Sequence, residues 1–220
     1  MRLKLLMLLL TGIIGLEATD IKKEEPKVQE WKIQNDPYYK NRKSQFEVLT
    51  MNEKYTTMML GDSITDEGLW DELLNNDKVQ NRGISGDTTN GVLDRLNSIS
   101  SNIQQVFIMI GVNDIMRGKE VDEIYANYLK IIKTFKDKNI KVYIQSTLYI
   151  GETRKANFNP KVEELNKRLE KYANENKITF INLNPIFAPQ KVLKKEFTAD
   201  DLHLNGSAYK LWAQEIKKYF

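Results

Sequence analysis

Residues 57–63 read TMMLGDS, a largely apolar run that ends in glycine, aspartate and serine. A short continuous apolar run bounded by a turn is typical of a strand buried in a parallel sheet. Ser63 is therefore predicted just beyond the carboxyl end of a strand, where open α/β sheets carry their functional groups. Alone, such a tripeptide is a weak signal, so its interpretation depends on the rest of the chain.

The alternation of short apolar runs with amphipathic stretches continues to the end of the chain. Strands are predicted at residues 56–60, 79–82, 105–110, 141–146 and 179–181. Helices are predicted at residues 69–74, 89–98, 121–137, 160–174 and 206–219. Because apolar strands alternate with helices, the pattern indicates an α/β fold in which helices cover both faces of a parallel sheet.

The composition argues against several classes of protein. The 220 residues suffice for one domain, and 41% apolar with 29% charged residues is ordinary for a globular protein. The net charge is only +3, with lysine and glutamate interspersed, which argues against a nucleic-acid partner. The chain has no cysteine and one histidine, so we expect no disulfide, no thiolate nucleophile and no metal site.

The first 18 residues are predicted to be a signal peptide. Arg2 and Lys4 precede an apolar stretch at residues 5–16, which has the length of a signal and is short for a membrane span. Cleavage is expected after Ala18, although Leu16 fits the −3 position imperfectly. We therefore expect an exported protein, periplasmic or secreted, without stable membrane insertion after signal removal. An uncleaved membrane anchor is the alternative.

Residues 19–53 are predicted to be a leader followed by an N-terminal helical segment, ahead of a main domain at residues 54–220. Residues 20–30 are charged and contain proline, which is typical of a flexible connection. A helix is predicted at residues 39–49. The aromatic residues of this segment, for which packing on the domain is favoured over stacking on a ligand, are Trp31, Tyr38, Tyr39 and Phe46.

Four polar stretches lie where a site would form. Residues 61–63, 81–88 and 111–114 each follow a predicted strand, and residues 200–203 precede the last predicted helix. The carboxyl ends of parallel strands meet at one edge of the sheet, so we expect these stretches to converge.

Three side chains in these stretches fit nucleophilic acyl transfer. Ser63 is the candidate nucleophile, and His203, the only histidine, is the single candidate base. Asp200 lies three residues before His203 and is the favoured orienter of the imidazole, with Asp201 as the alternative.

The same stretches hold candidate donors for the developing oxyanion. These are the backbone N–H groups of Ser63 and Gly86 and the side-chain amide of Asn113. Each stretch also has a structural explanation, because such residues often begin helices and a lone histidine is more often structural. A single catalytic site, however, explains all four stretches together.

The order of these motifs resembles the SGNH hydrolases, also called the GDSL esterase/lipase family. The motifs are GDS at residues 61–63, Gly86, GVND at residues 111–114 and DDLH at residues 200–203. Residues 81–89, NRGISGDTT, are especially similar to members near platelet-activating-factor acetylhydrolase and the bacterial lysophospholipase L1-type esterases. The resemblance covers about residues 54–220.

The resemblance implies a flavodoxin-like three-layer α/β/α sandwich with a central, mostly five-stranded parallel sheet. It implies ester hydrolysis that needs neither a metal nor a cofactor, and it sets no oligomeric state. Carried over by position, Ser63, Asp200 and His203 form the catalytic triad, and Ser63, Gly86 and Asn113 form the oxyanion hole. One residue departs from the common pattern, since Leu204 stands where many members have proline.

The substrate is predicted from what the chain lacks. It has no apolar lid-like insertion, and its longest connection, residues 148–159, is polar with a few aromatic residues. An open polar rim favours a short acyl group, such as acetyl, on a carbohydrate, and sialic acids are one such class. Arg82, Arg117 and Arg154 are candidates for binding a sugar carboxylate.

Two other functions remain open at this stage. One is a lysophospholipase or thioesterase, which would need an apolar acyl groove. The residues available for such a groove are Leu148, Tyr149, Ile150 and Phe158. The other is a glycan-binding module that keeps the fold without the chemistry, although the complete set of candidate catalytic residues argues against it.

Overall fold

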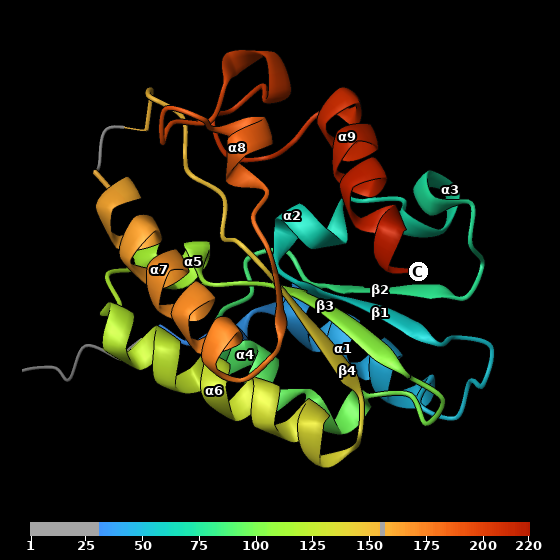
Figure 1. The fold of residues 1–220 in the computed structure, drawn as a ribbon. Helices are drawn as coiled ribbons and strands as arrows, with labels where there is room; N and C mark the ends of the chain where they lie inside the picture. Colours follow the sequence, from blue (N-terminus) through green and yellow to red (C-terminus); the bar gives the residue numbers. More distant parts are fainter. Residues whose placement is uncertain (1–30, 155–156) are drawn as a thin grey trace, which may run out of the picture. The chain divides into compact units, whose positions relative to one another are not determined.

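Five parallel strands form the central sheet in a computed structural model that describes residues 31–154 and 157–220. The strands are β1 (Thr57–Gly61), β2 (Val79–Gly83), β3 (Gln105–Met109), β4 (Lys141–Gln145) and β5 (Thr179–Ile181). They lie in the order β2-β1-β3-β4-β5 (Figure 1). This order is that of flavodoxin-like sheets, and the predicted α/β class is confirmed. The predicted signal peptide and leader up to residue 30 lie outside the described residues.

Nine α-helices surround the sheet in the described part of the chain. They are α1 (Pro37–Val48), α2 (Ser63–Asp66), α3 (Trp70–Leu74), α4 (Thr89–Asp94), α5 (Val112–Met116), α6 (Val121–Asp137), α7 (Asn159–Glu175), α8 (Asn184–Phe187) and α9 (Gly206–Ile216). Figure 1 shows α3 and α9 on one side of the sheet and α4, α6 and α7 on the other. None of the helices described is both long and apolar enough for a membrane span.

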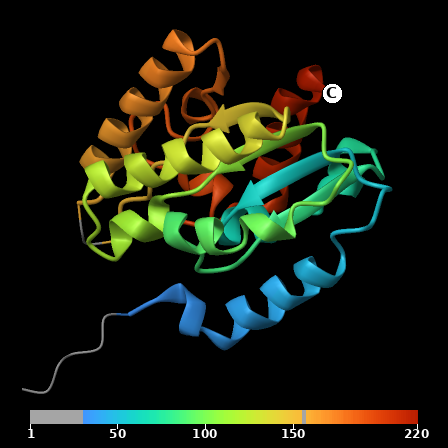
Figure 2. The same ribbon diagram turned by 90° about the horizontal axis from the view of Figure 1, so that it is seen from below.

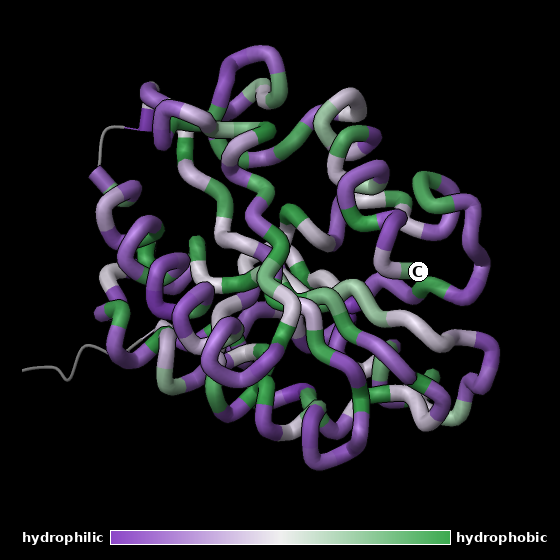
Figure 3. Tube along the Cα trace, in the orientation of Figure 1, coloured by the Kyte–Doolittle hydropathy of each residue, from purple (hydrophilic) through white to green (hydrophobic). Residues whose placement is uncertain are grey.

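Alternate residues of β1 contribute to two separate cores. Met58 and Leu60 pack in the core beneath α6 and α7, whereas Met59 packs in the core beneath α3 and α9. Side chains of a strand point to opposite faces in turn, so a strand buried on both faces needs an unbroken apolar run. Figure 3 shows these hydrophobic strands at the centre and hydrophilic stretches on the outer turns of α6 and α7.

The predicted helix at residues 89–98 is interrupted in the structure. Helix α4 ends at Asp94, and a 3₁₀ turn, η2, follows at Leu96–Ser98. The break falls at Arg95, whose buried side chain donates from Nε to Asp87 Oδ2 at 2.8 Å and from Nη2 to the Gly61 carbonyl oxygen at 3.2 Å. The predicted last helix likewise ends early, at Ile216, before another 3₁₀ turn, η4 (Lys217–Tyr219).

The N-terminal helix starts two residues before its predicted position. Asp36 caps α1 by accepting from the Tyr39 N–H at 3.0 Å, and proline at the first helical position suits this start. Tyr39 and Phe46 are buried, as expected for aromatic residues that pack on the domain. The packing prediction is wrong for Trp31 and Tyr38, which are exposed. Figure 2 shows α1 lying against α4 and the turn after it.

Candidate active site

The strand register brings three of the predicted stretches to one edge of the sheet. Gly61, the last residue of β1, pairs with Gly83 of β2 and with Met109 of β3. The chain segments that follow these strands therefore leave the sheet at the same level. A side chain at Gly61 would collide with the Met109 carbonyl oxygen, so the turn before Ser63 requires glycine.

Ser63 is the first residue of α2 and is almost completely buried, with 6% of its surface exposed. The residue that caps this helix is Asp62, whose carboxylate accepts from the Ile64 N–H at 3.1 Å. Ser63 is therefore not the cap that a structural explanation of the motif would make it. Its hydroxyl is available for the imidazole instead.

His203 joins Ser63 to Asp200. Its Nε2 lies 2.9 Å from Ser63 Oγ, and its Nδ1 lies 2.7 Å from Asp200 Oδ2. Proton positions follow from the network: an Nδ1–H that donates to the carboxylate leaves Nε2 as the acceptor for the serine hydroxyl. The structure thus brings together the three side chains that the sequence nominated, across 140 residues of chain.

Asp200 also fixes the backbone of the turn that carries the histidine. Its Oδ1 accepts from the His203 N–H at 2.8 Å and from the Leu202 N–H at 3.1 Å. Partial burial acts to raise the pKa of Asp200, but hydrogen bonds from the His203 N–H, the His203 ring and the Leu202 N–H outweigh it and lower the pKa to about 2. Asp200 is therefore an ionised acceptor at neutral pH.

Asp201 points away from the imidazole. Its φ of 64° is left-handed, a conformation that aspartate tolerates. Its carboxylate accepts from both the backbone N–H and the hydroxyl of Thr153, and its carbonyl accepts from the Gly151 N–H at 2.8 Å. Asp201 therefore braces the neighbouring 148–154 segment, and Asp200 alone of the two contacts the imidazole.

The two other predicted donor residues lie next to each other. Gly86 has a left-handed φ of 78° in the loop after β2, and Asn113 is buried in the first turn of α5. Asn113 Nδ2 donates to the carbonyl oxygen of Asp87, the residue after Gly86, at 3.0 Å. A carboxamide nitrogen carries two hydrogens, so this bond ties α5 to the Gly86 loop and leaves one donor for a ligand.

Three buried aspartates within these motifs were not predicted as part of the site. Asp62, Asp87 and Asp114 are each almost fully buried. Burial raises the pKa of Asp62 to about 8 and those of Asp87 and Asp114 to about 6. Arg95 pairs with Asp87 and partly opposes the rise at that residue. The signal in the sequence was an aspartate inside each of the first three motifs.

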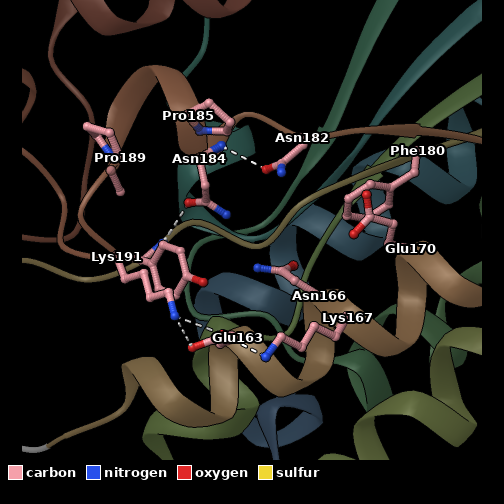
Figure 4. Close-up of a pocket in the computed structure, with 12 residues that line it drawn as sticks. Glu163, Asn166, Lys167, Glu170, Phe180, Asn182, Asn184, Pro185, Pro189 and Lys191 are labelled. Carbon is pink, nitrogen blue, oxygen red and sulfur yellow. Dashed lines mark hydrogen bonds and ion pairs between the residues drawn. The ribbon is translucent and has the colours of Figure 1, made fainter.

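A separate cavity of about 320 Å³ lies between α7, β5 and α8 (Figure 4). None of the predicted catalytic or oxyanion residues lines it. Its walls include the amide side chains of Asn166, Asn182 and Asn184, and Lys191 pairs there with Glu163 at 2.9 Å. The cavity therefore has both polar and apolar walls and is distinct from the Ser63 site.

The four residues nominated for an apolar acyl groove are buried or partly buried in the structure. Leu148 and Ile150 are buried in the core beneath α9, and Tyr149 is buried in the opposite core. Phe158 is partly buried against both cores. These side chains are therefore packed inside the described domain, and of the four only Tyr149 also lines the cavity between α7, β5 and α8.

The pattern of the GDSL-like Lipase/Acylhydrolase family matches residues 59–211, and the chain belongs to this family. It is therefore a hydrolase of the esterase and acylhydrolase class, as the resemblance in its motifs implied.

Solved structures of other bacterial proteins share the fold. A GDSL-like lipase from Bacteroides thetaiotaomicron is 25% identical, with a TM-score of 0.71 over 82% of this chain and 96% of that chain. A candidate platelet activating factor from Streptococcus pneumonia is 24% identical, with a TM-score of 0.77 over 83% of this chain and 92% of that chain.

A bacterial relative that is similar in sequence is longer than this chain. The N-acylneuraminate cytidylyltransferase of Streptococcus agalactiae serotype III is 26% identical over 192 residues, which are 84% of this chain and 44% of the relative. The chain thus spans less than half the length of that protein.

Proposed function

We propose that the protein is a serine esterase that removes short acyl groups, above all acetyl, from carbohydrate hydroxyls. The observation that carries the proposal is the continuous hydrogen-bonded path from Ser63 Oγ through His203 to Asp200, at 2.9 and 2.7 Å. A serine hydroxyl becomes a useful nucleophile when a positioned base accepts its proton, and a carboxylate that orients the base completes the arrangement.

The proposed reaction has two steps. His203 accepts the Ser63 proton as Oγ attacks the ester carbonyl, and the imidazolium then protonates the leaving alcohol. The oxyanion accepts hydrogen bonds from the Ser63 N–H, the Gly86 N–H and the Asn113 amide. Water, deprotonated by His203, attacks the acyl-serine and releases the acid, which restores Ser63.

Two observations support a short acyl group on a sugar. The apolar residues considered for an acyl groove are buried in the cores. A relative carries N-acylneuraminate, an acidic sugar, in its name.

We also propose that residues 1–18 direct export of the protein. Fractionation of cells that express the full chain tests this proposal.

The test compares hydrolysis of 4-nitrophenyl acetate, butyrate and octanoate by the wild type and by Ser63→Ala. Ser44→Ala is the matched control, since Ser44 is exposed on α1 and bonds only to the Asn41 carbonyl oxygen. We expect the wild type and Ser44→Ala to hydrolyse the acetate ester fastest, and we expect Ser63→Ala to be inactive. In a second assay, the wild type should release acetate from O-acetylated sugars. Octanoate preference would favour a lipid substrate, and Ser63-independent or absent hydrolysis would overturn the serine mechanism.

A further inference from the structure

Arg117 lies beside the two proposed oxyanion donors. It follows the last residue of α5, the helix that carries Asn113, and its Nη1 donates to the Asn113 carbonyl oxygen at 3.4 Å. Its Nη2 lies 3.5 Å from the position that a Cβ on Gly86 would occupy. The guanidinium therefore stands next to the Gly86 loop, close to where an acyl ester would be held.

Arg117 is exposed, and its guanidinium forms no ion pair with a carboxylate among the described residues. Each of the other two exposed or half-exposed arginines in the C-terminal half of the chain has a carboxylate partner: Arg154 contacts Asp200, and Arg168 contacts Asp122. The remaining candidate for a sugar carboxylate, Arg82, is buried with its guanidinium 4.5 Å from the Phe46 ring. Within the described part of the chain, Arg117 is thus the one candidate of the three with a guanidinium both accessible and free of an ion pair.

The Arg117 guanidinium lies over the ring of Trp31. The Arg117 Cζ lies 4.0 Å from the centre of the Trp31 ring, although 51% of the Trp31 surface is exposed. Stacking on an aromatic face orients a guanidinium while its in-plane N–H groups stay free to bind an anion. A guanidinium held in this way loses less conformational freedom when it binds a carboxylate.

The segment that carries Trp31 is itself fixed to the domain. Ile33 is buried with Tyr39, Phe46 and Ile84, and its side chain approaches the same Gly86 position to 3.7 Å. Gln34 donates from Nε2 to the Asn90 carbonyl oxygen at 3.3 Å. Residues ahead of the predicted domain boundary therefore contribute directly to the surroundings of the site.

We propose that Arg117, oriented by Trp31, binds a carboxylate on the sugar whose ester Ser63 cleaves. The inference rests on the proposed esterase function and adds its substrate class, an acylated acidic sugar. A planar guanidinium binds a carboxylate through two parallel N–H···O bonds, which give both charge and geometric selectivity. Its position beside Gly86 and Asn113 puts the guanidinium within reach of a substrate held by the proposed oxyanion donors.

The test uses one sugar ester in a charged and a neutral form. The substrates are O-acetylated N-acetylneuraminic acid and its methyl ester, and acetate release gives kcat and KM for each. In the wild type we expect the acid to be preferred. Arg117→Met lowers the acid-to-methyl-ester ratio of kcat/KM about tenfold or more, mainly through KM for the acid, because a charge-assisted pair is lost. Arg117→Lys restores part of the ratio.

Controls separate this inference from the function on which it rests. Arg168→Met removes the same charge on α7 and leaves the ratio unchanged. An equal loss on both substrates in Arg117→Met would assign Arg117 a structural role in the Gly86 loop and overturn the carboxylate site. If wild type shows no Ser63-dependent hydrolysis of either ester or of 4-nitrophenyl acetate, the esterase proposal itself fails.

Discussion

The Tyr209 hydroxyl donates a 2.7 Å hydrogen bond to the Ile64 carbonyl oxygen, which joins the helix after His203 to the helix that starts with Ser63. The two residues are 145 positions apart in sequence, and the bond is buried. Tyr209 also packs against both Trp70 and Trp212, whose rings meet edge to face at 4.7 Å. These contacts join the two helices that flank the Ser63–His203 hydrogen bond.

Tyr209→Phe tests that relationship. The change leaves the buried Ile64 carbonyl without its partner, so we expect the free energy of unfolding to fall by about 1–3 kcal/mol in urea denaturation. The kcat should fall as well, since α2 and α9 are no longer joined at this point. Tyr172→Phe is the control, because the Tyr172 hydroxyl makes no hydrogen bond among the described residues. Equal losses in the two variants would contradict the proposed link.

Asp200→Asn distinguishes the two adjacent aspartates. Asparagine cannot accept the imidazole N–H as a charged partner, and we expect kcat on 4-nitrophenyl acetate to fall by about a thousandfold or more. Because the pKa of Asp200 is about 2, the wild-type carboxylate stays ionised between about pH 5 and about pH 9. The asparagine amide does not titrate in this range, so the loss of activity in the variant should be the same throughout it. Asp201→Asn, which affects the contacts to Thr153, should retain most of the activity. A larger loss in Asp201→Asn would reverse the assignment.

Asp62→Asn tests the buried carboxylates through the pH dependence of stability. Burial raises the folded-state pKa of Asp62 to about 8, above its unfolded value of about 3.9. The folded protein then binds more protons than the unfolded chain between these values, so the free energy of unfolding should fall as pH rises from about 4 to 8. Asp87 and Asp114 act in the same direction up to about pH 6.

An asparagine at this position stays neutral and keeps an oxygen for the Ile64 N–H, so Asp62→Asn should be more stable than wild type at about pH 8. Urea unfolding at about pH 5, 6.5 and 8 measures the slope of stability against pH in both proteins. Wild-type stability that rises with pH, or a slope that Asp62→Asn leaves unchanged, would show that Asp62 is ionised in the folded protein.

Asn113→Ala tests the oxyanion donor. We expect kcat on 4-nitrophenyl acetate to fall by about a hundredfold or more, with a smaller change in KM, because the amide is proposed to donate mainly in the transition state. The change also removes the bond to the Asp87 carbonyl oxygen, so circular dichroism and urea unfolding check the fold. An effect confined to KM would assign Asn113 to ground-state binding instead.

The strands and the long helices were predictable because each depends on local periodicity. β1 is an unbroken apolar run since both of its faces are buried, and α6, Val121–Asp137, has the bounds that its pattern predicted. The short helices α2, α5 and α8 were not predicted as helices, since four or five residues carry little periodicity, although α3 of the same length was predicted. The break falls at Arg95, whose buried ion pair with Asp87 is not visible in helical periodicity.

The candidate site was predictable as a set of side chains and not as a network. Ser63, His203 and Asp200 were chosen by chemical type and position, and the structure brings them within hydrogen-bonding distance. The contact between Trp31 and Arg117 was missed, since the residues lie 86 positions apart and Trp31 was interpreted as a packing residue. Contacts of that separation depend on how the N-terminal segment folds back on the domain.

The docking of that segment depends on Phe46, which gives the last prediction. Three guanidinium groups surround its ring, with those of Arg82, Arg42 and Arg95 at 4.5, 5.0 and 5.7 Å from the centroid. Phe46→Ala should lower the free energy of unfolding by about 3–5 kcal/mol, because it removes a buried aromatic ring and exposes a cluster of like charges.

Val48→Ala is the control on the same helix, since Val48 is largely exposed, and it should change the free energy of unfolding by about 0.5 kcal/mol or less. The two variants are compared by urea denaturation. A small effect of Phe46→Ala would mean that α1 contributes little to the domain, and the boundary predicted at residue 54 would then mark the start of an independently stable unit. A large effect instead makes residues 31–53 part of the folded hydrolase, because the Phe46 ring covers guanidinium groups on both β2 and the segment after α4.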